Sequence, residues 1–195
     1  MAEKDPALTF RMALSSATRT RHEATEAVVS ELSVFSSEPA YAGWLKALQE
    51  MHAHFASTSD FANQILGMEA TSAALLSALR HDMDQLGVAP TASPSQPLTP
   101  SDPAIALGVG YVLEGSGLGA SVLYDRSIAA GISAVRYLDL SRSLARQRWR
   151  TFLERLNEHA LATAPSVETA SSAADDVFIF LAARLEQNAP ARPHL

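Results

Sequence analysis

The chain has 195 residues, a formal net charge of −6, a pI of about 5.5 and no cysteine. A chain of this length is expected to form one domain over residues 1–195. The acidic balance argues against a nucleic-acid partner and against an anionic membrane surface. Without cysteine, disulfides, zinc thiolate sites, iron–sulfur clusters and thiol nucleophiles are excluded. A metal site would have to use histidine, carboxylate or tyrosine.

The N-terminal segment lacks the apolar centre of a secretion signal, since Glu3, Lys4, Asp5 and Pro6 precede a polar helix. No stretch looks long and apolar enough to cross a bilayer. We therefore expect a cytoplasmic protein.

Helical periodicity runs through nearly the whole chain without strand-like alternation, so the sequence predicts an all-α fold. The expected helices cover residues 8–32, 39–66, 71–86, 104–130 and 141–161, and a last helix begins after residue 165. Pro39 suits a first helical turn, Gly87 a left-handed C-cap and Ser166 an N-cap. Residues 88–103 hold five of the ten prolines and predict a surface connection, and residues 189–195 predict a loose tail.

Five glycines lie between Gly108 and Gly119 in a segment that is otherwise apolar and free of proline. Each should cost about 1 kcal/mol relative to alanine inside a helix. The apolar pattern favours a helix that bends over a loop. Gly115 and Gly119 lie one turn apart on one face, where a flat ligand or another helix could approach the backbone closely. The segment alone leaves both explanations open.

His22 falls at the edge of the apolar face of the first expected helix, so its imidazole should point inwards. Glu26 lies one turn further on and could hold the ring in the neutral tautomer that binds metals. Arg19, on the same side, could face an anion. The alternative is a core histidine with a satisfied hydrogen bond. No histidine forms the Glu-x-x-His pair of a carboxylate di-iron bundle.

The expected helix over residues 141–161 carries five arginines away from its apolar stripe. They favour a solvated face, with an anion or an acidic partner as the alternative. The five are Arg142, Arg146, Arg148, Arg150 and Arg155.

Four segments together resemble the haem oxygenases of the bacterial branch, over nearly the whole chain. Residues 17–26 contain Ala-Thr, then a histidine, then a glutamate four residues later, as in the first helix of that family. Residues 111–123 are similar to its distal-helix signature, Glu-Gly-Ser-x-Leu-Gly. Residues 41–45 with 54–55 resemble its second helix, and residues 82–87 the end of its third.

The resemblance implies a helical bundle with a glycine-kinked distal helix and an enzyme that opens haem to biliverdin, carbon monoxide and iron. O2 and an external electron donor, either a protein or a small reductant, would be required. Haem would be both substrate and cofactor. His22 would ligate the iron and Glu26 would orient the imidazole, while Gly115 and Gly119 would let the backbone lie close over the macrocycle. Ser116 stands where some branches carry an aspartate that organises water, so another water anchor would be needed.

Basic side chains usually hold haem propionates, and Arg19 and Arg126 are the candidates here, with Tyr111 as a further haem contact. Ser15 and Asp125 stand where positive charge is expected, which leaves the biliverdin isomer open. A non-catalytic haem- or biliverdin-binding protein, serving for example a bilin-binding photoreceptor, is one alternative. A helical interaction module whose glycines only pack helices is another.

Overall fold

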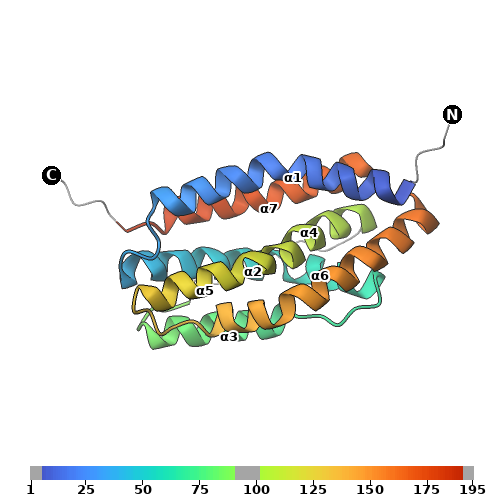
Figure 1. Cartoon of the computed structure of the whole chain (residues 1–195). Helices are drawn as coiled ribbons and strands as arrows, with labels where there is room; N and C mark the ends of the chain where they lie inside the picture. Colours follow the sequence, from blue (N-terminus) through green and yellow to red (C-terminus); the bar gives the residue numbers. More distant parts are fainter. Residues whose placement is uncertain (1–5, 91–101, 191–195) are drawn as a thin grey trace.

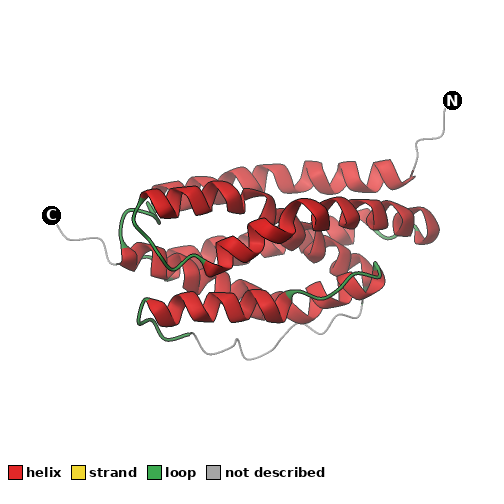
Figure 2. Cartoon of the chain, turned by 60° about the horizontal axis from the view of Figure 1, so that its bottom comes forward, coloured by secondary structure: helices red, strands yellow, loops and turns green. Residues whose placement is uncertain are grey.

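The chain folds into α-helices joined by short turns over residues 6–90 and 102–190, which the computed structural model describes, and these residues contain no strand. The all-α prediction is confirmed (Figures 1 and 2). The helices are α1 (Pro6–Glu31), α2 (Glu38–Ile65), α3 (Ser72–Gln85), α4 (Pro103–Ser116), α5 (Ala120–Ala129), α6 (Arg136–Thr163) and α7 (Val167–Gln187), with the 3-10 turn η1 (Gly117–Gly119) between α4 and α5. Residues 91–101 of the expected connection and 191–195 of the expected tail lie outside the described residues.

The packing of α1 decides where space remains in the bundle. α1 lies beside α7 (Figure 1) and also packs on α6, but it barely touches α4. α4 packs instead on α7, α2 and α6. Fully buried apolar side chains such as Tyr41 and Leu45 of α2 and Phe152 and Leu156 of α6 form the core, and each contributes about 1.5–3 kcal/mol by its burial. This arrangement leaves room between α1 and the α4–η1–α5 segment.

Local signals set most helix ends where the sequence predicts them. The side chain of Ser37 caps α2 ahead of Pro39, and that of Ser166 caps α7 by accepting a hydrogen bond from the Thr169 N–H at 3.2 Å. Gly87 follows α3 with φ +66°, and Gly131 follows α5 with φ +76°. The predictions for Pro39, Gly87 and Ser166 are confirmed, and the side chain of Ser37 is an additional cap.

The predicted start of α6 at residue 141 is wrong, because the helix begins at Arg136. The side chain of Asp82, fully buried at the end of α3, accepts hydrogen bonds from the N–H groups of Arg136 at 2.9 Å and Tyr137 at 2.8 Å. Burial raises the pKa of this carboxyl, although the two N–H donors oppose the shift. A residue more than fifty positions away therefore caps α6, and no cap appears in the local sequence.

The bent helix predicted over residues 104–130 divides into α4, η1 and α5, with the bend at the glycines. Gly108 and Gly110 serve helix packing. A Cβ on Gly108 would lie 2.0 Å from the carbonyl oxygen of Ala170 in α7, and one on Gly110 would lie 2.8 Å from the Cβ of Ala62 in α2. A Cβ on Gly119 would meet nothing within 4 Å. Helix packing therefore explains Gly108 and Gly110, whereas the backbone at Gly119 faces open space.

Among the described residues, Pro103–Ala129 is long and apolar enough to cross a membrane by length and composition, with a mean hydropathy of 1.3. The expectation that no stretch meets this criterion is wrong. The stretch packs against α2, α6 and α7, is interrupted by η1 and is 44% buried in its most apolar window. Core helices of a bundle satisfy the same criterion. The cytoplasmic location stays a prediction.

Candidate functional site

A cavity of about 1230 Å³ lies between α1 and the α4–η1–α5 segment. Phe178 and Leu181 of α7, Trp44 of α2 and Trp149 of α6 complete its walls. Typical sites for small organic ligands measure roughly 300–1,000 Å³ and combine an apolar lining with a few polar groups. This cavity has the size and the lining for a large, mainly apolar ligand.

All of the site residues that the sequence predicts line this one cavity. One wall is α1, and the opposite wall is α4, η1 and α5, so the two motifs face each other although about ninety residues separate them. The predicted residues on these walls are Arg19, His22, Glu26, Tyr111, Gly115, Ser116, Gly119 and Arg126.

The His22 side chain is 57% exposed at the cavity, so it is not the buried core histidine of the alternative interpretation. Its Nδ1 atom lies 3.7 Å from Oε1 of Glu26. The edge of the ring meets Phe178, with 6.0 Å between the ring centroids and 83° between the planes. The 3.7 Å between Nδ1 and the Glu26 carboxylate is longer than a hydrogen bond. In the neutral tautomer with its proton on Nδ1, the Nε2 lone pair is available for a metal.

The opposite wall presents bare backbone at Gly119, between side chains such as those of Leu118 and Val122. Gly119 is open to the cavity, while a Cβ on Gly115 would touch the Trp149 ring at 3.4 Å. The hydroxyl of Ser116 donates to the Leu113 carbonyl of its own helix at 2.7 Å. Tyr111 meets Trp149 edge to face, with 5.1 Å between the ring centroids. A ligand on this side would contact main chain near the glycines and aromatic rings at one end.

Charged side chains lie at several points of the cavity wall. Arg19 is one turn before His22 on α1, Arg126 is near the end of α5, and Glu23 and Glu26 complete the charged lining. Ser15 also lines the cavity. The two guanidinium groups can receive carboxylates from opposite walls.

The five arginines of α6 do not form one solvated face. Arg142 pairs with Asp139 at 2.7 Å and lies 3.6 Å over the ring of Tyr124, and Arg155 pairs with Glu158 at the surface. The expectation of a solvated side chain is wrong for Arg148, which is only 16% exposed and pairs with Glu114.

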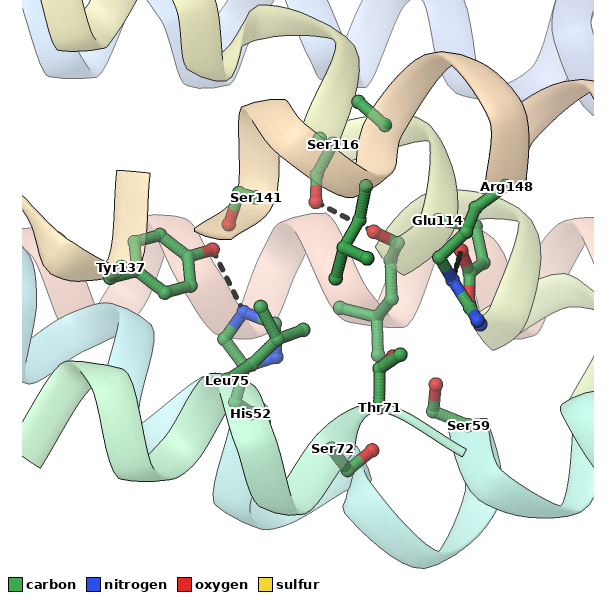
Figure 3. A pocket seen from close by; sticks show the side chains of 14 residues that line it. His52, Ser59, Thr71, Ser72, Leu75, Glu114, Ser116, Tyr137, Ser141 and Arg148 are labelled. Atoms are coloured by element: carbon green, nitrogen blue, oxygen red, sulfur yellow. Dashed lines mark hydrogen bonds and ion pairs between the residues drawn. The ribbon is translucent and has the colours of Figure 1, made fainter. Parts of the chain in front are cut away.

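A second, small cavity of about 40 Å³ lies behind the helix break (Figure 3). His52 of α2 and Tyr137 of α6 line it, with 2.9 Å between the histidine Nε2 and the tyrosine hydroxyl. Burial lowers the pKa of His52 to about 4 and raises that of Tyr137 to about 12, so both are neutral at pH 7. The space is polar and large enough for water. Ser116 lines both cavities.

Sequence reasoning missed the pair formed by His52 and Tyr137, which are 85 positions apart. The only signal in the sequence is a polar residue among the apolar positions of α2, between Met51 and Phe55. A polar residue at such a position predicts that a hydrogen-bond partner is buried beside it, but the sequence does not show which residue that partner is.

Replacing His52 with glutamine is expected to flatten the loss of stability on acidification. Because burial holds the pKa of the folded histidine near 4, only the unfolded chain takes up a proton between pH 6.5 and 4. Between pH 7 and pH 4.5 the wild-type free energy of unfolding should therefore fall by about 2 kcal/mol more than that of His52→Gln. Urea unfolding of both proteins at pH 7 and pH 4.5 measures the difference, and equal losses would contradict it.

The described residues contain no cluster of three or more histidine, aspartate, glutamate or cysteine side chains able to hold a metal ion.

Helices wrapped around a large cavity, with a glycine-broken helix as one wall, define the class of fold. Among solved structures, the chain is similar to the haem oxygenase from Neisseria meningitidis in its NO- and CO-bound crystal structures, with a TM-score of 0.76 and 22% sequence identity. The match covers 95% of this chain and 94% of that one. The fold is therefore that of haem oxygenase, as the sequence motifs predict. No family model and no curated protein matches the chain.

Proposed function

We propose that this chain is a haem oxygenase, which binds haem in the large cavity and cleaves it to biliverdin, carbon monoxide and iron. The observation that carries the proposal is the position of His22 across a cavity of about 1230 Å³ from the side-chain-poor backbone at Gly119. One imidazole suffices, because a porphyrin supplies the other iron ligands. The donor set and the space both fit haem.

The residues around the cavity have distinct proposed roles. His22 would bind iron through Nε2, while Glu26 holds the proton at Nδ1. Gly119 and Gly115 would allow the main chain to approach the macrocycle, and Phe178 would cover its other face beside the histidine. Bound haem supplies the redox chemistry, and the protein supplies orientation and exclusion of water.

Arg19 and Arg126 would receive the haem propionates, since guanidinium groups bind carboxylates with two parallel hydrogen bonds. The two arginines lie on different walls, so the one that is used would set the rotation of the ring and the biliverdin isomer. Tyr111 would contact the macrocycle beside Trp149. Ser116 cannot act as an acid of carboxylate strength, and the water anchor that this position requires would be the small polar cavity behind it.

The reaction needs O2 and electrons from an external donor, a protein or a small reductant. Biliverdin would then be available to a partner such as a bilin-binding photoreceptor. Arg19 and Glu23 are exposed residues of the cavity lining, and haem would enter and the product leave beside them.

Haemin titration followed by reduction in air tests the proposal. We expect a sharp Soret band at one haem per chain, and on addition of ascorbate its replacement by a bilin spectrum with release of carbon monoxide. A haem complex that ascorbate and air leave intact would identify a haem-binding protein without oxygenase activity. A chain that gives no Soret shift would exclude both.

Gly119→Leu is expected to weaken haem binding about tenfold or more without loss of stability. A Cβ at this position meets no protein atom within 4 Å, and the rest of the leucine side chain is expected to extend into the cavity, where overpacking costs about 1–3 kcal/mol. Gly119→Ala is the smaller step, and both should fold at least as stably as wild type because glycine is a poor helix former. Titration with haemin and thermal unfolding separate the two effects. Equal haem affinity in all three proteins would place the ligand elsewhere.

A further inference from the structure

The helix break is a flexible sequence held by its contacts with α6. Gly115, Gly117 and Gly119 fall within five residues, and such a stretch has little stiffness of its own. A Cβ on Gly115 would lie 3.4 Å from Trp149, and one on Gly117 would lie 3.4 Å from the Cβ of Ala145. α6 therefore supports the break from one side, while the large cavity lies along the break as well.

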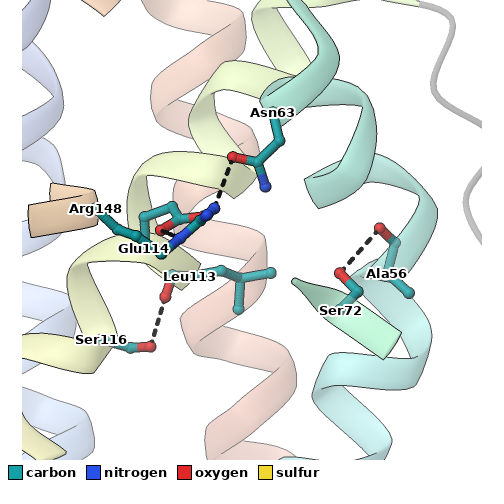
Figure 4. Close-up of polar contacts among 7 residues, drawn as sticks. All are labelled: Ala56, Asn63, Ser72, Leu113, Glu114, Ser116 and Arg148. Carbon is teal, nitrogen blue, oxygen red and sulfur yellow. Dashed lines mark hydrogen bonds and ion pairs between the residues drawn. The ribbon is translucent and has the colours of Figure 1, made fainter. Parts of the chain in front are cut away.

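A largely buried ion pair adjoins this break and connects three helices, α4, α6 and α2 (Figure 4). The side chain of Glu114, immediately before Gly115, is only 8% exposed. Arg148 of α6 donates to both of its carboxylate oxygens, from Nε at 3.0 Å to Oε2 and from Nη2 to Oε1. Nη2 also donates to Oδ1 of Asn63 in α2 at 3.2 Å. This bidentate contact fixes the orientation of the Glu114 carboxylate relative to the Arg148 guanidinium as well as the distance between them.

Such a pair is not expected to contribute much to the stability of the fold. Two charges lose their hydration when they are buried, and well-packed apolar residues of similar volume often leave a protein equally stable. The better-attested use of a buried pair is to select one arrangement among several. Here the pair would select one position for the backbone around Ser116. Ser116 lines both cavities, with Gly115 on the large one and Gly117 on the small one.

We infer that Glu114 and Arg148 are positioning residues that hold the glycine break at a fixed place along the wall of the large cavity. They set how closely the backbone from Gly115 to Gly119 approaches a bound ligand. We call this ion pair, Glu114 with Arg148, the clamp. That the ligand is haem rests on the proposed function, whereas the clamp is a property of the haem-free chain. The substrate is touched by the glycines, not by the ion pair.

Hydrogen exchange of the haem-free protein tests the clamp directly. Glu114→Leu with Arg148→Met removes both charges and keeps most of the volume. We expect its amides at residues 115–120 to exchange at least tenfold faster than in wild type, while those of α3 are unchanged. The matched control is Arg155→Met with Glu158→Leu, a surface pair on the same helix, and we expect it to exchange like wild type.

A second readout uses the CO complex of the reduced haem protein. Wild type should show a single C–O stretching band, and the double variant several bands, because the wall would occupy more than one position. Glu114→Gln, which keeps shape and one acceptor, should give an intermediate result and is informative even if the double variant does not fold.

Unchanged exchange at residues 115–120 in both Glu114 variants would overturn the inference. So would faster exchange spread over every helix, since that is the result of a merely structural role. If wild type binds no haem, the proposed function fails, but the exchange experiment still decides whether the clamp exists.

Discussion

Replacing His22 with alanine is expected to abolish the sharp Soret band of the haem complex and to weaken haem binding by more than about 100-fold. Outer partners of a metal ligand contribute about 10–100-fold, and the ligand itself should contribute more. Folding should be unaffected, because the imidazole is 57% exposed and lies 3.7 Å from the carboxylate of Glu26, its partner in an exposed ion pair. Exposed substitutions of this kind change stability by less than about 0.5 kcal/mol.

Added imidazole gives a sharper form of the same experiment. The space left by His22→Ala opens into the cavity, so free imidazole should enter it and restore the Soret band. His159→Ala in α6 is the matched control, since that residue does not line the cavity and should bind haem like wild type. A His22→Ala protein with the wild-type spectrum and affinity would place the iron ligand elsewhere.

Glu26→Gln is expected to retain the Soret band with about 10–100-fold weaker haem binding. The amide lacks the charge that holds the Nδ1 proton, although it can still accept a hydrogen bond. The same titration with haemin measures this change. Affinity equal to that of wild type would show that Glu26 does not orient the ring.

Helix ends follow from the sequence where the cap is local. Gly87 directly follows α3 and Ser166 directly precedes α7, so residue type and position next to the helical pattern are enough to find these caps. The start of α6 fails this rule because its cap, Asp82, belongs to α3. Only the tertiary fold brings that carboxylate to Arg136, and no local pattern contains this information.

The site divides in the same way into local motifs, which the sequence predicts, and contacts between distant residues, which it does not. His22 with Glu26 is a one-turn pair, and the glycines of the broken helix are contiguous, so each motif is visible in the sequence. Their position on opposite walls depends on α1 packing beside α7 and away from α4. The pair of His52 with Tyr137 and the pair of Glu114 with Arg148 join different helices. Neither pair has a spacing that a sequence pattern could indicate.

Gly108→Ala is expected to destabilise the fold by about 3 kcal/mol or more. The added Cβ would lie 2.0 Å from the carbonyl oxygen of Ala170 and 2.8 Å from its carbonyl carbon, so two backbones would have to separate. Overpacking in a core costs about 1–3 kcal/mol, and backbone has fewer ways to relax than a side chain. For a chain of this size the loss corresponds to a melting temperature lower by about 6–12 °C.

Gly119→Ala is the matched control for this substitution, because its Cβ meets nothing within 4 Å and alanine favours a helix by about 1 kcal/mol. The two proteins receive the same methyl group in the same broken helix, and we expect opposite changes in stability. Thermal and urea unfolding of both measure the difference. Equal stability of the two variants would show that α4 does not pack on α7 at Gly108. It would also contradict the placement of the cavity wall, because α4 packs mainly on α7 and only slightly on α1.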